Sequence, residues 1–185
     1  MTENFEGILM NIVEYDGERY YCMKNKFLDS SFIEVELNLA KKLFMELYPN
    51  PDYNTFDSEK IMDYIKLSKE VGLLEITKDA CMHVLDKRKE SEVMVKKALP
   101  ILTSTYRALK NPNEAIKLAG QYIADPNYTS VPLLNSLASA YLDIGDPKTA
   151  KKYLARAQEK SGNKGVMDPE ISAVYARIQR EYGDI

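Results

Sequence analysis

Few residues in this sequence have the type and the spacing that catalysis or metal binding requires. The chain of 185 residues has one histidine, His83, which lies two residues after Cys81. The pair offers two donor types that zinc accepts, but no further cysteine or histidine lies at zinc-ligand spacing. No nucleophile motif accompanies His83, and the sequence has no glycine-rich phosphate loop. We therefore expect a protein that is not an enzyme, with no catalytic residue, no metal and no cofactor.

The composition is typical of a soluble globular protein. Hydrophobic residues make up 45% of the chain and charged residues 29%. No apolar run approaches the roughly 18 residues of a membrane span, and residues 1–6 carry acids where a secretory signal carries basic residues. Two cysteines, Cys22 and Cys81, cannot form a disulfide framework. We expect a cytoplasmic protein with no membrane partner.

The charges divide the chain into two parts. Residues 1–55 contain 10 acidic and 5 basic residues, whereas residues 56–185 contain 18 acidic and 20 basic residues. We expect an acidic N-terminal segment over 1–55, followed by a second region over 56–185. The overall net charge of −3 disfavours a dedicated nucleic-acid surface.

A step of 35 residues relates three segments of the second region. Ala80, Ala115 and Ala150 are 35 residues apart, and gap-free copies run near 61–95, 96–130 and 131–165. In each copy, positions 4, 7, 8 and 11 share one face of a helix. These positions are Tyr64, Leu67, Ser68 and Val71; Leu99, Leu102, Thr103 and Tyr106; and Leu134, Leu137, Ala138 and Tyr141.

Turn signals divide each copy into two helices. Asn111-Pro112 and Asp146-Pro147 fall at the same repeat position, and each predicts an N-cap followed by proline in the first helical turn. Gly145 provides a chain reversal before the second helix. Small residues at positions 8 and 20 let two antiparallel helices approach closely.

This pattern resembles the tetratricopeptide repeat (TPR) family, most clearly over Leu134–Pro147 with Ala150, Leu154 and Ala157. The resemblance covers about 61–162 and implies an all-α, right-handed α-solenoid of stacked antiparallel helix pairs. The sequence departs from the family in its repeat of 35 rather than 34 residues and in the leucine at position 4 of two copies. The related pentatricopeptide family has 35-residue repeats and binds RNA, so RNA binding is a less favoured alternative.

The ends of the array are less regular. Asp168-Pro169 predicts a helix over 169–182, which is either a capping helix or the start of a further repeat. A helix from Ser31 to about Tyr48 looks like part of a degenerate repeat, because Ala40, Phe44 and Leu47 have the spacing of its second helix. Residues 1–30 form either two helices or a β-hairpin that turns at Asp16-Gly17.

The resemblance also implies where a partner would bind. In the family, inward-facing positions of the first helices line a concave groove. Mapped onto this chain, they include Met62, Ile65, Lys69, Lys97, Ser104, Arg107, Asn135, Ser139 and Leu142. The mixture of apolar and basic residues favours an acidic or C-terminal segment of a partner protein. We expect a protein–protein adaptor or scaffold, with self-assembly into a homo-oligomer as an alternative.

Basic residues also cluster outside this groove. The clusters are Lys87–Lys89, and Lys148, Lys151, Lys152 and Arg156. With acids beside them in the sequence, we interpret both clusters as solvated helix faces.

Overall fold

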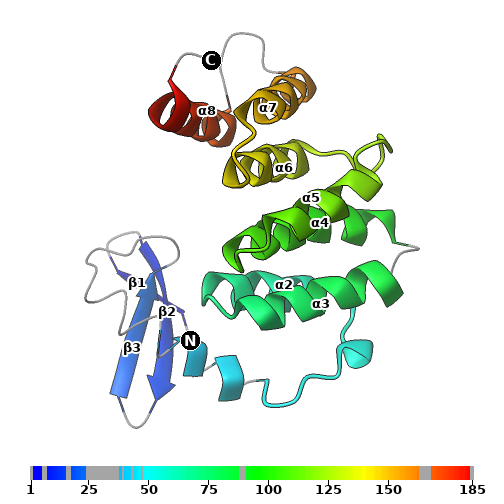
Figure 1. Cartoon of the computed structure of the whole chain (residues 1–185). Helices are drawn as coiled ribbons and strands as arrows, with labels where there is room; N and C mark the ends of the chain where they lie inside the picture. The colour runs from blue at the N-terminus through cyan, green and yellow to red at the C-terminus, as the bar shows by residue number, and fades with distance from the viewer. Residues whose placement is uncertain are drawn as a thin grey trace. The chain divides into compact units, whose positions relative to one another are not determined.

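The structure is a computed structural model, shown in Figure 1. It describes residues 2–5, 8–15, 18–23, 38, 40–42, 44–46, 48–87, 91–162 and 168–183. The chain divides into two compact units, residues 1–47 and residues 48–185.

The first unit contains a three-stranded antiparallel sheet with the strand order β1-β2-β3. The strands are β1 (Thr2–Phe5), β2 (Ile8–Tyr15) and β3 (Glu18–Met23). In the β2–β3 pair Tyr15 lies opposite Glu18, so the connection is the two-residue segment 16–17. Asp-Gly is a preferred pair for such a connection, and the β-branched and aromatic residues around it favour extended backbone. The two-helix interpretation is therefore wrong for these residues, and the hairpin alternative is confirmed.

The remainder of the first unit is described only in part. Residues 38, 40–42 and 44–46 are helical, which agrees with the later portion of the helix predicted from Ser31 to about Tyr48. Phe44 is buried. Ser31 and Leu47 lie outside the described residues. The all-α prediction thus fails for the strands of the first unit.

The second unit is helical. Its described residues form a short 3₁₀ helix and seven α-helices. They are η1 (Tyr53–Thr55), α2 (Ser58–Glu70), α3 (Leu74–Lys87), α4 (Glu92–Ala108), α5 (Pro112–Tyr122), α6 (Val131–Asp143), α7 (Pro147–Ser161) and α8 (Pro169–Tyr182). The predicted C-terminal helix and α8 have the same bounds.

Side-chain caps fix where several of these helices begin. Asp146 Oδ1 accepts a hydrogen bond from the Thr149 amide at 3.0 Å, and Asp168 Oδ1 accepts one from the Glu170 amide at 2.9 Å. Asn111 is the N-cap residue of α5 and is followed by proline in the first turn, as predicted, but its side chain makes no capping hydrogen bond. Gly145 has a φ of +81°, which is the left-handed reversal expected before α7.

Successive helices of this unit pack on one another, as Figure 1 shows from α2 to α8. The pairs α2–α3, α4–α5 and α6–α7 are in contact, and so are α2–α4, α4–α6 and α6–α8. Ala80, Ala115 and Ala150 are fully buried, one in the second helix of each pair. Three apolar residues of α8, Ile171, Val174 and Ile178, belong to the same core cluster as Leu154.

The helix bounds correct the register of the first pair. Helices α4 and α6 end at Ala108 and Asp143, 35 residues apart, as predicted. Helix α2, however, ends at Glu70, which is 38 residues before Ala108. The first pair is therefore shifted by three residues, almost one helical turn, relative to the gap-free alignment.

This shift accounts for two buried residues of the first pair. It does not account for Leu67, which is 44% exposed although the residues it aligns with at steps of 35 and 38, Leu102 and Thr105, are both buried. A step of 38 residues places Tyr64 at the position of Leu102 and Thr77 at the position of Ala115, and both residues are buried. The hydroxyl groups of Ser68 and Thr77 lie 3.0 Å apart and share a hydrogen bond where α2 meets α3.

Candidate functional site

Basic side chains of α2, α4 and α8 bond to residues of neighbouring helices in the second unit. Lys69 is on α2, Arg107 is in the last turn of α4, and Arg177 is on α8. The Lys69 ammonium group donates a hydrogen bond to Ser104 Oγ at 2.7 Å, which joins α2 to α4. The predicted groove residues Lys69, Ser104 and Arg107 therefore lie together.

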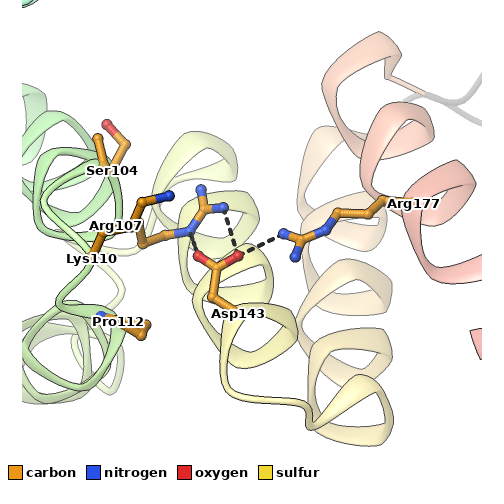
Figure 2. A pocket seen from close by; sticks show the side chains of 7 residues that line it. Ser104, Arg107, Lys110, Pro112, Asp143 and Arg177 are labelled. Carbon is orange, nitrogen blue, oxygen red and sulfur yellow. Dashed lines mark hydrogen bonds and ion pairs between the residues drawn. The ribbon is translucent and has the colours of Figure 1, made fainter. Parts of the chain in front are cut away.

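Asp143, the last residue of α6, connects the two arginines. Arg107 Nε lies 2.6 Å from Asp143 Oδ2, and Arg177 Nη1 lies 2.7 Å from Asp143 Oδ1. Arg177 also donates from Nε to Glu181 Oε1 at 2.9 Å. Figure 2 shows the two guanidinium groups directed toward one carboxylate from opposite sides. One side chain of α6 thus ties α4 to α8.

The surroundings of these charges shift their pKa values. Desolvation opposes the charged form of Asp143, but the hydrogen bonds from Arg107 and Arg177 outweigh it and lower the pKa of the carboxyl. Desolvation lowers the pKa of the Lys69 ammonium, and the charge of Arg107 adds to this effect. An anion that came close to Lys69 would relieve both penalties.

A pocket of about 530 Å³ opens beside this network. It is lined by Ser104, Arg107, Ala108, Lys110, Pro112, Asp143 and Arg177 (Figure 2). Three of the lining residues are cations and one is a carboxylate, so the pocket has an excess of positive charge. Lys110 is exposed and forms no ion pair within the part of the chain that the structure describes. The pocket therefore has a cation available for a negatively charged guest.

Several predicted groove residues are buried and cannot face a partner. Ile65 is fully buried, because the three-residue shift places it at the helix crossing occupied by Thr103 in the next pair. Met62, Ser139 and Leu142 are at most 7% exposed, and Leu142 belongs to the core cluster around α8. For these four residues the prediction of a partner-binding surface is wrong.

Two other predicted residues remain open to a guest. Lys97 is exposed on α4. Asn135 of α6 is partly exposed, but its Oδ1 atom is buried and has no hydrogen-bond partner among the described residues. A buried acceptor without a partner carries a cost in free energy that a donor from a guest would remove.

Sequence reasoning missed Lys110, Asp143 and Arg177. A signal for two of them was available, because Arg107 and Asp143 are 36 residues apart and Asp143 and Arg177 are 34 residues apart. Opposite charges about one repeat apart lie on neighbouring first helices and can meet. Lys110 had no such signal, since it lies in the turn after α4 and has a φ of +63°.

The two residues considered for catalysis, Cys81 and His83, do not line this pocket. Cys81 is a free, fully buried thiol, and desolvation raises its pKa to about 12, which makes it a poor nucleophile near neutral pH. The His83 ring packs edge-on against Tyr53, with their centroids 5.5 Å apart. Within the described ranges, no group of three or more His, Cys, Asp or Glu side chains could hold a metal ion. The chemistry that the described pocket offers is the binding of an anion.

Neither a membrane-spanning helix among the described residues nor a similar known protein was found. None of the helices in the described segments combines the length and the apolar character needed to cross a bilayer. Comparison of the chain with protein-family models, with curated proteins and with solved structures gave no match in any of the three.

Proposed function

We propose that this protein is a non-enzymatic adaptor that binds an acidic segment of a partner protein beside the first helices of a TPR-like, right-handed solenoid. The serial contacts α2–α4, α4–α6 and α6–α8 support this arrangement, because they align the first helices of consecutive pairs along one side. Repeats stacked in this way leave an extended surface suited to a peptide or a helix. The two-cysteine composition supports the reducing cytoplasm as its compartment.

The observation that carries the proposal is the excess of positive charge in the pocket. Asp143 balances one of the charges of Arg107 and Arg177, and Glu181 also pairs with Arg177, so a net charge of about +1 remains, which Lys110 carries. Arginine forms paired hydrogen bonds with carboxylates, and lysine supplies a mobile point charge. Side-chain carboxylates or a C-terminal carboxylate of a peptide fit this set of donors.

The test is selection from a library of random peptides with free C-termini, using the full-length protein as bait. We expect the selected sequences to be enriched in aspartate and glutamate. Lys69→Ala combined with Lys110→Ala should weaken their binding, because it removes the lining cation Lys110 and the cation bonded to the lining residue Ser104 without disturbing the Asp143 pairs. The control is Lys66→Ala with Lys117→Ala, which removes two exposed lysines of α2 and α5 that neither line the pocket nor bond to a residue that does.

Calorimetric titration of the selected peptides against all three proteins provides the measurement. Unchanged affinity in the Lys69/Lys110 variant would exclude the pocket as the binding site. If the control variant weakened peptide binding equally, the loss of affinity would be explained by net charge alone and not by the pocket. Selection of peptides without any acidic preference would contradict the proposed partner class.

A further inference from the structure

Helix α7 has a continuous basic face. Lys148, Lys152, Arg156 and Lys160 follow one another at four-residue intervals, and all four are exposed. Four-residue spacing places side chains on one face of a helix, and these four span about 18 Å along the axis. Glu159 is the only acid in the helix, whereas Lys151 adds a fifth cation. We call Lys148, Lys152, Arg156 and Lys160 the α7 basic face.

The charges of this face form no ion pairs within the described protein, although Lys152 interacts electrostatically with the Asp146 carboxylate. No described residue forms an ion pair with any of its four members, although exposed lysines elsewhere, such as Lys66 and Lys117, pair with acids one turn away. Like charges at four-residue spacing repel one another and lower helix stability slightly. Asp146 at the N-cap directs its carboxylate to the Thr149 amide. The exposure of all four side chains agrees with the solvated helix face that the sequence predicted.

A small pocket adjoins the C-terminal half of the α7 basic face. Its volume is about 260 Å³, below the roughly 300–1,000 Å³ of small-molecule sites. The lining residues are Ile123, Ala124, Pro126, Thr129, Leu134, Arg156, Glu159 and Lys160. A space of this size and lining suits one large apolar side chain with charged residues at its rim.

Arg156 is fixed at the edge of this pocket. Its guanidinium group lies over the Tyr153 ring at 5.6 Å from the centroid, and Nη2 lies 3.5 Å from the carbonyl oxygen of Ile123. The Tyr153 ring is itself stacked on Tyr141, with centroids 5.4 Å apart. A guest therefore meets one preorganised cation and three mobile lysines, which lowers the entropy lost on binding.

We propose that the α7 basic face and the pocket beside it bind a second protein segment, an acidic helix that carries one apolar anchor residue. Carboxylates at four-residue spacing on such a helix match the spacing of the four cations. The anchor fills the pocket, and the ion pairs surround it, as in interfaces where one buried side chain provides most of the affinity. This site shares no lining residue with the pocket beside Asp143, so the chain can hold two partners at once.

A protein segment fits these features better than a nucleic acid does. The apolar lining of the pocket suits an aliphatic or aromatic side chain, whereas a phosphate backbone would leave it unfilled.

The test uses the full-length protein and a fluorescein-labelled synthetic peptide of about 18 residues, with glutamate at every fourth position and one leucine after the last glutamate. Fluorescence anisotropy measures its binding at low and physiological salt. The α7 variant, which combines Lys148→Glu, Lys152→Glu and Lys160→Glu, should bind the peptide roughly ten-fold or more weakly. Ala124→Phe, which fills the pocket, and replacement of the peptide leucine by alanine should each weaken binding by about ten-fold.

The matched control is Lys66→Glu, Lys96→Glu and Lys117→Glu, which produces the same change in net charge on α2, α4 and α5. This variant should bind the peptide as the unmodified protein does. A second peptide, with glutamine in place of every glutamate, tests the same contacts with the unmodified protein, so the test does not depend on the folding of the α7 variant. The glutamine peptide should not bind.

Four results would overturn the proposal. The first is no binding of the acidic peptide, and the second is equal loss in the control variant. The third is that a labelled poly(U) oligonucleotide binds more tightly than the peptide and that the α7 variant loses this binding. This result would assign the α7 basic face to nucleic acid. The fourth is that the protein self-associates in sedimentation velocity and that the α7 variant does not. This result would make a second copy of this chain the occupant.

Discussion

Replacing Asp143 with asparagine should loosen the contact of α4 and α8 with α6. The carboxylate accepts hydrogen bonds from Arg107 at 2.6 and 3.4 Å and from Arg177 at 2.7 Å. The side chains involved are 23–28% exposed. Hydrogen bonds to charged groups contribute about 1.5–3 kcal/mol when well shielded, and exposed ion pairs contribute about 0–1 kcal/mol. For this partly shielded network we expect a loss of about 1–2 kcal/mol in the free energy of unfolding.

The effect should depend on pH in a defined direction. Because the pKa of Asp143 in the folded protein is lowered from its ordinary value of 3.8, its charge stabilises the fold above that value. The contribution is lost as the pH falls through the lowered pKa, where the carboxyl becomes protonated. The difference between the unmodified protein and Asp143→Asn should therefore be full near neutral pH and shrink below about pH 4.

Urea unfolding followed by far-ultraviolet circular dichroism measures this difference at a series of pH values. The matched control is Asp63→Asn, which removes an ion pair to Lys66 whose side chains are more than half exposed. Its free energy of unfolding should change by less than about 0.5 kcal/mol. Equal stability of Asp143→Asn and the unmodified protein near neutral pH would refute the role of Asp143 as a tie. So would a difference that stays constant down to acidic pH.

Two further predictions test the packing register and the helix caps. Leu137→Ala should lower the free energy of unfolding by about 2–5 kcal/mol, because Leu137 is 1% exposed, whereas Leu67→Ala at 44% exposure should cost less than about 1 kcal/mol. Urea midpoints measure both, and similar costs would contradict the exposed position of Leu67. Asp146→Ala should cost about 1 kcal/mol through loss of the Thr149 cap, whereas Asn111→Ala, which removes no cap bond, should cost only a few tenths. Thermal unfolding compares these two, and an Asn111 variant as unstable as the Asp146 variant would show that capping does not explain the difference.

The sequence predicted the last two pairs well because several local signals agreed there. The helical spacing of Leu134 and Leu137, the Asp146 cap and the reversal at Gly145 all indicate the same helix ends. In the first pair these signals were weak. Both Ala80 and Thr77 are small and fully buried, so residue type alone could not decide which of them marks the helix crossing. Only the ends of α2 and α3 distinguish a step of 38 from one of 35.

The strands of the first unit were ambiguous for another reason. Ile8, Ile12 and Val13 have a spacing that suits one face of a short helix, but the same residues have β-branched side chains that favour a strand. The turn pair Asp16-Gly17 was the stronger local signal, since a two-residue connection fixes the register of a hairpin. Apolar spacing over so few residues cannot outweigh that constraint.

The candidate site was predicted only in part. The repeat positions of Ser104 and Arg107 predicted that both face a groove, and both line the pocket. Asp143 and Arg177 were missed although opposite charges about one repeat apart were a signal for them. Ile65 was misplaced by the three-residue register error of the first pair.

The tie formed by Arg107, Asp143 and Arg177 also has a mechanical consequence for the second unit. It joins three consecutive layers near the C-terminal ends of α4 and α6, so it restrains how far these layers can spread along that edge. If a guest bound in the pocket as we propose and drew one guanidinium group away from Asp143, part of this restraint would be lost, and α4, α6 and α8 would be less firmly held to one another at that edge.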